Sequence, residues 1–519
     1  MTVRKFRWLC LLVFVLVMVT LLGCSDESGT SSENGDSGSN ADVPQDLTYA
    51  TTSDVVGLSP IDTNDSVSSA VIEQVYETLF VRDPETMEIK PLLAESYENP
   101  DDLTWVIKLR EDITFHDGTP FNAEAVKYTF EEFKSEERAA PRASLLEAIE
   151  SIEVQDEYTV VLKTDEPYGP LLAALSHTNA SIVSPEADKS GNLNQNPVGT
   201  GPFVFEEWVQ GDHVSLSKNE DYWQGAPQLE NVTMKVVPEY STAVSMLQTG
   251  EVQFIDAIPT DQLPRLESMD NVEIQQKEGT PVYYLGFNMN KEPFNDINFR
   301  KAVSHAVNRE AYVQQLKGLG VQNNSIIGPK VFGYDETASE EGYKYDPEKA
   351  KQLIEENGYE GQEITLLSAN RDMYMKMAEI VQAQLSDAGL KVSIETMEWG
   401  TFLDTTAEGN FEMTFLGWSN STADGSELLY PNLHSDNIGS SNRMAYDNSE
   451  FDQLVNASRV TVDQAERQEK LHEANVMAAN DGVWVPMHHG VVTAAIDKSV
   501  KGLELDPTGQ WSLYNVSRE

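Results

Sequence analysis

Cysteine is almost absent from this chain of 519 residues, and both copies, Cys10 and Cys24, lie near its start. A disulfide framework, a cysteine-ligated zinc site and a cysteine nucleophile are therefore excluded for the rest of the sequence. Catalytic signatures are missing too: the sequence holds no Gly-x-Ser-x-Gly, no His-Glu-x-x-His and no phosphate-binding loop. We therefore expect a protein that is not an enzyme, with no catalytic residue, no metal site and no cofactor. A secreted hydrolase is the competing class.

Positive charge is also scarce. The sequence has 36 Lys and Arg residues against 85 Asp and Glu residues, and its formal net charge is −49. Nucleic-acid binding needs a basic surface, so we expect no nucleic-acid partner. The acidic residues are spread along the chain. They are typical of a solvated surface in salty surroundings rather than of a site for cationic substrates.

Only the N-terminus carries a long apolar run, residues 8–23, with three cations before it. The run is shorter than the roughly 20 residues of a membrane span, and its layout predicts a signal peptide over residues 1–23. The letters "LLGC" at residues 21–24 resemble a bacterial lipobox. Cleavage before Cys24 would leave a lipid-bearing cysteine, anchoring the protein to the outer face of the cytoplasmic membrane; the alternative is a plain membrane anchor. Residues 24–46, rich in Ser, Gly, Asp and Asn, predict a disordered, lipid-anchored linker.

Strand and helix patterns alternate over residues 362–418. Strands are expected at 362–369, 391–397 and 411–417, with helical patterns between them. Such alternation implies a mostly parallel sheet and an α/β fold.

The segment "GWSNSTADGSELLYPNLHS", residues 417–435, has the composition of a loop. It follows the last predicted strand of this region, so it would lie at the carboxyl end of a parallel strand, where α/β sheets bind ligands. Trp418 and Asp424 are therefore candidate ligand residues. The alternative is a surface loop with Trp418 packed inward.

Five segments in order resemble the family 5 extracytoplasmic solute-binding proteins of ABC importers, which serve oligopeptide, dipeptide, glutathione and nickel uptake. They are "PLLAESYENPDDLTWVIKLREDITFHDGTPFNAEAVKYTF" (91–130), "NPVGTGPFVFEEWVQGDHVSLSKNEDYWQGAPQLENVTMKVV" (196–237), "YYLGFNMNKEPFNDINFRKAVSHAVNRE" (283–310), "GWSNSTAD" (417–424) and "VWVPMHHGVVTA" (483–494).

The resemblance implies an α/β, two-lobed periplasmic-binding-protein-like clamshell with mixed sheets and an extra subdomain in the first lobe. Lobe one would comprise residues 47–282 and 492–519, and lobe two residues 283–491. The expected function is capture of short peptides, including glutathione-like ones, and delivery to the permease subunits of an ABC importer. We expect a monomer that meets the membrane only through its lipid. Nickel-chelate or heme-type cargo is the alternative.

The same resemblance implies site residues. Peptide-binding relatives commonly place an Asp for the ligand's ammonium group three residues after the Trp, and Ser421 occupies that position here. Asp424, six residues after Trp418, is then the candidate amine clamp, as in the glutathione-binding branch. Trp418 would form a wall of the cleft. Trp399 would lie near the cleft or pack in the core, and Arg142 lies where some relatives place a cation for the ligand's carboxylate.

Overall fold

The computed structural model describes residues 43–519. The signal peptide, the lipidation of Cys24 and nearly all of the linker 24–46 lie outside the described residues, so these stay predictions. None of the described helices is both long and apolar enough to cross a membrane. The Nε2 of Gln45 donates to the carbonyl of Arg518 at 2.8 Å, just before the first strand begins at Asp46. Lobe one and lobe two are used below for the predicted ranges.

The largest sheet in residues 43–519 has 11 strands, in the order β15-β14-β16-β12-β17-β11-β1-β10-β9-β8, with β13 paired to β17. β14 pairs in parallel with β15 and β16, and β1 with β10 and β11, whereas the other pairs are antiparallel. The predicted α/β class with mixed sheets is therefore confirmed. The strands are β1 (Asp46–Thr51), β8 (Phe203–Val209), β9 (His213–Lys218), β10 (Asn231–Val236), β11 (Phe254–Asp256), β12 (Val272–Phe287), β13 (Gly320–Val321), β14 (Glu363–Ala369), β15 (Lys391–Met397), β16 (Met413–Trp418) and β17 (Trp484–Asp497).

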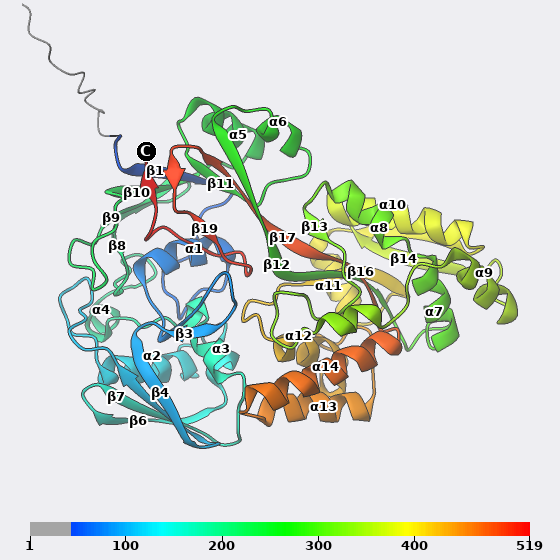
Figure 1. Ribbon diagram of the computed structural model, residues 1–519, viewed down its shortest axis with the longest axis horizontal. Coiled ribbons are helices and arrows are strands. Elements are labelled where there is room, and N and C mark those ends of the chain that lie inside the picture. The colour runs from blue at the N-terminus through cyan, green and yellow to red at the C-terminus, as the bar shows by residue number, and fades with distance from the viewer. Residues whose placement is uncertain (1–42) are drawn as a thin grey trace, which may run out of the picture. The chain divides into compact units, whose positions relative to one another are not determined.

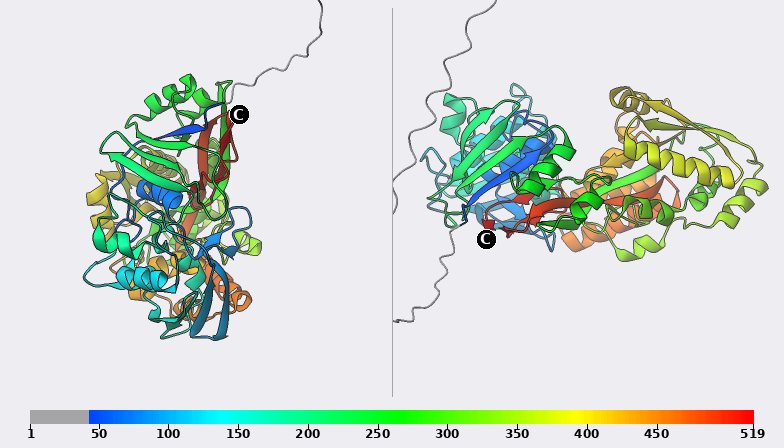
Figure 2. Two further views of the ribbon diagram at one scale, coloured as in Figure 1. Left: turned by 90° about the vertical axis from the view of Figure 1, so that its left-hand side faces the viewer. Right: turned by 90° about the horizontal axis from the view of Figure 1, so that it is seen from above.

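Two long strands, β12 and β17, run antiparallel side by side through the middle of this sheet (Figures 1 and 2). Their pairing extends from Val272 opposite Asp497 to Gly286 opposite Trp484. The register shifts between Glu278 and Val282, where the chain bulges out of the ladder. One continuous ribbon therefore joins the strands of lobe one to those of lobe two.

Smaller sheets lie beside the large one. An antiparallel sheet in the order β4-β5-β7-β6 packs against α2 and accounts for the extra subdomain expected in lobe one (Figure 1). The remaining strands form three two-stranded sheets among the described residues, β2-β3, β18-β21 and β19-β20. The bounds are β2 (Phe80–Arg82), β3 (Ile89–Pro91), β4 (Ala94–Asp101), β5 (Thr104–Leu109), β6 (Ile149–Asp156), β7 (Thr159–Thr164), β18 (Val500–Lys501), β19 (Glu504–Leu505), β20 (Trp511–Ser512) and β21 (Ser517–Arg518).

The helices cover these sheets. They are α1 (Ser66–Val75), α2 (Ala123–Lys134), α3 (Leu171–Leu175), α4 (Pro185–Ser190), α5 (Tyr240–Thr249), α6 (Leu263–Glu267), α7 (Ile297–Ala306), α8 (Arg309–Val313), α9 (Pro347–Glu356), α10 (Asp372–Asp387), α11 (Trp399–Ala407), α12 (Gly425–Leu433), α13 (Ser449–Val460) and α14 (Gln464–Asn480). Single-turn 3₁₀ helices lie at Ala143–Leu146, Thr178–Ala180, Gln314–Leu316, Glu336–Glu340 and Ser435–Asn437.

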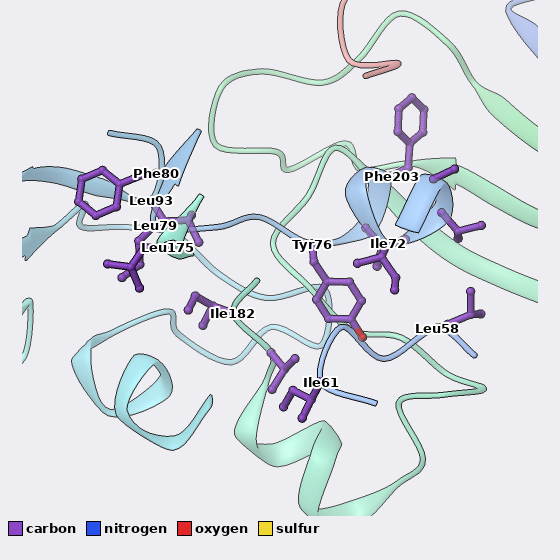
Figure 3. Packing of buried hydrophobic residues seen from close by; sticks show 14 of the residues in the cluster. Leu58, Ile61, Ile72, Tyr76, Leu79, Phe80, Leu93, Leu175, Ile182 and Phe203 are labelled. Carbon is purple, nitrogen blue, oxygen red and sulfur yellow. The ribbon is translucent and has the colours of Figure 1, made fainter. Parts of the chain in front are cut away.

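Apolar side chains gather in three cores among the described residues. Two of them draw on residues 47–272 and 494–516, and the third on residues 282–487. Figure 3 shows part of the core that contains α1, in which Ile72 belongs to the helix, Tyr76 follows it directly, and Ile182 is a further member. Burial of these side chains is the main favourable term in folding. The separate cores leave a boundary between the lobes at which polar groups can meet.

The alternating region 362–418 folds as predicted, in the order β14, α10, β15, α11, β16. The segment 417–435 is a correction, because only residues 419–424 form a loop and α12 follows at once. Gly425 and Pro431 lie inside that helix and hid it from composition-based reasoning. Asp424 is the N-cap, and its side chain accepts a hydrogen bond from the backbone N–H of Ser426.

The start of α9 gives a test of local helix capping. Asp346 accepts from the backbone N–H of Lys349 at 2.9 Å, and Pro347 occupies the first turn. Asp346→Ala should lower the free energy of unfolding by about 1 kcal/mol, because this N–H loses its partner. Urea unfolding followed by circular dichroism measures the change. Glu355→Ala on the same helix is the control and should stay within about 0.5 kcal/mol of the parent protein; equal losses in both variants would contradict the capping role.

Candidate functional site

A cavity of about 330 Å³ lies where lobe one meets the 419–424 loop of lobe two. This volume is at the lower end of the usual range for small-molecule pockets. Lobe one supplies nearly all of the wall, and Ser421 is the contribution of lobe two. The lobe-one residues come from the end of α1 and the residues after it, from residues 81–84, Leu92 and Pro202, from the segments 176–181 and 222–224, and from the C-terminal hairpin 504–514. We call this space the first cavity.

Two carboxylates in the first cavity have unusual protonation behaviour. Burial raises the pKa of the Glu73 carboxyl to about 8, against one hydrogen bond from Thr178, and the charge of Asp506 adds to the rise. Burial likewise raises the pKa of the Glu77 carboxyl to about 7, opposed by hydrogen bonds from Tyr222 and other donors. At neutral pH Glu73 is therefore mostly protonated, and an approaching cation would favour its ionised form.

Two arginines of lobe one hold the 419–424 loop. The Nη2 of Arg142 donates to the Oγ of Ser421 at 2.9 Å. The Nη2 of Arg82 donates to the backbone carbonyl of Thr422. A third contact joins the lobes nearby, because the N–H of Gly169 donates to the carbonyl of Arg459 at 2.8 Å. The predicted residues Arg142 and Ser421 are thus in direct contact across the interface.

A carboxylate that sequence reasoning missed lies behind Ser421. The Oγ of Ser421 lies 3.3 Å from Oε1 of Glu427, and Oε2 of Glu427 accepts from the backbone N–H of Thr422 at 2.8 Å. Burial raises the pKa of the Glu427 carboxyl. Glu427 lies in the first turn of α12, and the loop-like composition of residues 417–435 does not predict this helix. An acidic residue in the first turn after an N-cap Asp was the available signal.

Asp424 already has a cationic partner. Its Oδ1 lies 2.5 Å from the Nη2 of Arg467 and also accepts from the hydroxyl of Ser426 at 2.7 Å. Burial opposes the ionisation of Asp424, but the charge of Arg467 and the hydrogen bonds outweigh it and lower its pKa. Both side chains are buried, with 2% of Asp424 and 1% of Arg467 exposed. Asp424 as amine clamp stays a prediction, and it would have to share its carboxylate with Arg467.

The two tryptophans lie on lobe two. Trp418 ends β16 opposite Val282 and packs, partly buried, against the lobe-two core. Trp399 begins α11. The guanidinium carbon of Arg371 lies 3.7 Å from the centroid of the Trp399 ring, and the ring of Phe402 stacks on it with centroids 5.7 Å apart. Neither tryptophan is among the described residues that line the first cavity or a second cavity between the lobes. Their roles toward a ligand stay predictions.

A second cavity, of about 540 Å³, also lies between the lobes. Lobe one lines it with Arg82, residues 85–89 of the β2–β3 turn, Tyr97 and residues 169–173. Lobe two lines it with residues 329–334, 422–424 and 464–468. Asp424 and Arg467 belong to this wall, so the predicted site residues Ser421 and Asp424 face different cavities.

His488 and His489, which are adjacent on β17, both contact other residues of the chain. His488 stacks on Tyr283 with ring centroids 4.5 Å apart, and the Nε2 of His489 lies 3.0 Å from the carbonyl of Ser325. Across the part of the chain that the structure describes, no group of three or more His, Cys, Asp or Glu residues is placed to hold a metal ion.

Comparison with known proteins defines the class. Residues 88–440 match the model of the bacterial extracellular solute-binding proteins, family 5, and the chain belongs to this family. It is 35% identical over 408 residues to the glutathione-binding protein GsiB of Escherichia coli K12, covering 76% of this chain and 78% of that one.

Solved structures agree on the fold. HbpA2 of Haemophilus parasuis superposes with a TM-score of 0.84 at 27% identity, over 91% of this chain and all of the other. The periplasmic binding protein DppA of Helicobacter pylori, solved with the peptide STSA, gives a TM-score of 0.73 at 28% identity, over 91% of this chain and 98% of that one. The predicted two-lobed clamshell is therefore confirmed.

The Asp424–Arg467 pair gives a stability prediction. Asp424→Asn should lower the free energy of unfolding by about 3–5 kcal/mol, because it leaves the buried Arg467 without its counter-charge. Urea unfolding at pH 7 measures the loss. Glu466→Gln, which breaks the exposed pair of Glu466 with Lys470, is the matched control and should cost no more than about 1 kcal/mol. A loss of that small size in Asp424→Asn would show that the carboxylate is free for another partner.

Proposed function

We propose that the protein is the substrate-binding component of an ABC importer and captures short peptides, including glutathione-like ones, between its two lobes. The observation that carries the proposal is the first cavity, walled by lobe one and completed by Ser421 of lobe two. Relatives support the peptide class: one is named as glutathione-binding, and two neighbours were solved with STSA and with Met-Leu. Delivery to a membrane permease follows from the family.

Capture requires that the ligand favour the closed arrangement of the lobes. A ligand shifts such an equilibrium only through contacts that it makes better in one state than in the other. The first cavity offers such contacts, because a molecule in it touches α1 and the hairpin 504–514 on one side and Ser421 on the other. Closure about the β12–β17 ribbon would then present a shape that the permease recognises.

The charged ends of a peptide find complementary groups here. Glu73 and Glu427 make no ion pair with any described residue. Glu73 can receive an ammonium group directly, and Glu427 can do so through the hydroxyl of Ser421, which is hydrogen-bonded to it. Arg142 and Arg82 supply positive charge for a carboxylate beside the same loop. Asp424 is the third candidate for the ammonium group, in competition with Arg467, and Trp418 and Trp399 are proposed as neighbouring walls of the cleft.

The setting of the protein completes the proposal. Anchored through lipid on Cys24 and held off the membrane by residues 24–46, a monomer would work at the outer face of the cytoplasmic membrane. The protein performs no chemistry on the ligand, so a bound peptide should be released unchanged.

Native mass spectrometry of the mature protein, purified without refolding, tests the proposed cargo. We expect a co-purified mass that fits a short peptide and is recovered unchanged after denaturation. A mass that fits a nickel chelate or a heme would overturn the peptide assignment. Cleavage products of an added peptide would instead support the hydrolase class.

Protonation of Glu73 gives a sharper prediction. At pH 7 its carboxyl is mostly protonated, since its pKa is about 8. A ligand ammonium group beside it lowers that pKa, so binding should release up to one proton. Calorimetric titration in buffers of different ionisation enthalpy measures the release for a tripeptide with a free amine and for its acetylated form.

The variants identify the amine receptor. Glu73→Gln should remove most of the proton release, leaving only the share of Glu77, whose pKa is about 7, and should weaken the free peptide more than the acetylated one. Asp424→Asn is the comparison variant: if it alone separates the two peptides, Asp424 is the clamp and Glu73 is not. Equal proton release from the free and acetylated peptides would remove Glu73 from this role.

A further inference from the structure

We propose that Arg82 sets the length of peptide that the protein accepts, by dividing the space between the lobes into two cavities. This inference rests on the proposed function and adds a residue that determines specificity. Arg82 ends β2, far in sequence from the loop that it contacts, and it lines both cavities.

On one side of the interface the chain passes from the first cavity to the second just after Arg82. Val81 and Pro84 line the first cavity, whereas residues 85–89 line the second. The same change occurs on lobe two, where Ser421 lines the first cavity and residues 422–424 line the second. The hydrogen bond from Arg82 to the carbonyl of Thr422 joins these two crossing points. Together they form a partition.

The guanidinium group of Arg82, which forms the partition, makes no ion pair with any described residue. Arg82 is half-buried and pairs with no carboxylate among the described residues, although the charges of Asp506, Asp424 and Glu427 act on it from further away. Its bond to a carbonyl leaves other guanidinium N–H groups free to bind a carboxylate, which arginine does well in a two-pronged geometry. A peptide in the first cavity can therefore end with its carboxylate at Arg82.

The second cavity is suited to further residues of a longer peptide. It would more than double the space available, since its volume is about 540 Å³ against about 330 Å³. Met87, Ile89, Phe332 and Tyr334 give part of its wall an apolar character, beside charged side chains such as Glu85, Glu88 and Lys330, and the cation of Arg467 is already neutralised by Asp424. Such a surface accepts varied side chains, but Arg82 separates it from the first cavity.

Arg142 provides a matched control. It also reaches from lobe one to the same loop, one residue away at Ser421, yet it is not among the described residues that line either cavity. Loss of Arg142 removes a bond between the lobes without removing the partition. Loss of Arg82 removes both.

The test measures the affinity of the mature protein for unblocked alanine peptides of two to six residues by isothermal titration calorimetry. The parent protein should bind the di- and tripeptide most tightly. Arg82→Ala should bind trialanine about tenfold more weakly, the factor for one charge-assisted hydrogen bond, and the ratio of hexa-alanine to trialanine affinity should rise at least tenfold. Arg142→Ala should weaken all lengths by a similar factor and leave that ratio unchanged.

Arg82→Lys guards against a folding defect, since it keeps the charge and much of the bulk and should retain the preference for short peptides. An unchanged ratio in a folded Arg82→Ala protein would overturn the inference and leave the proposed function standing. Failure of the parent protein to bind any peptide of the series would overturn the proposed function and the inference with it.

Discussion

The antiparallel ladder between β12 and β17 fixes where the strands of both lobes lie. It pairs Val272 with Asp497 at one end and Gly286 with Trp484 at the other, so a single ribbon carries both lobes. β16 is bound to β12, and the 419–424 loop leaves the end of β16. The β12–β17 ribbon thus determines where that loop lies against lobe one. The bulge between Glu278 and Val282 interrupts the ladder near its middle, where bending would cost the fewest regular hydrogen bonds.

Given that placement, two arginines of lobe one hold the loop, and Arg82 also lies where the two cavities meet. Arg142 and Arg82 contact consecutive residues of one loop, and both come from lobe one. In a chain with a formal net charge of −49, a cation brought to the interface is surrounded by carboxylates at longer range. Those carboxylates stabilise the buried charge without capturing it in an ion pair, which keeps the guanidinium available. Arg467 shows the opposite arrangement, because Asp424 pairs with it directly.

Much of the fold could be predicted from local sequence, and much of the site could not. The alternation over 362–418 depends on residues close together in the chain, and the structure confirms it. Helix α12 was missed because Gly425 and Pro431 are typical of loops, although tertiary packing keeps them helical. Arg82 and Thr422 are 340 residues apart, and no periodicity or spacing reports such a contact. The resemblance led to Arg142 and Ser421 separately, but only the structure shows that they touch.

The position of the carboxylates bears on how a peptide would lie. In this chain Ser421 is neutral, Asp424 is bound to Arg467, and the nearest acid behind the loop, Glu427, is covered by Thr422. The carboxylates that line the first cavity, Glu73, Glu77, Glu504 and Asp506, make no ion pair with any described residue, and all of them belong to lobe one. An ammonium group held there would draw the ligand deeper into lobe one, and its carboxylate would then point back toward the lobe boundary, where Arg82 lies. On the proposed function, the neutral Ser421 and the carboxylates of lobe one therefore favour a ligand bound mainly by lobe one and closed over by lobe two.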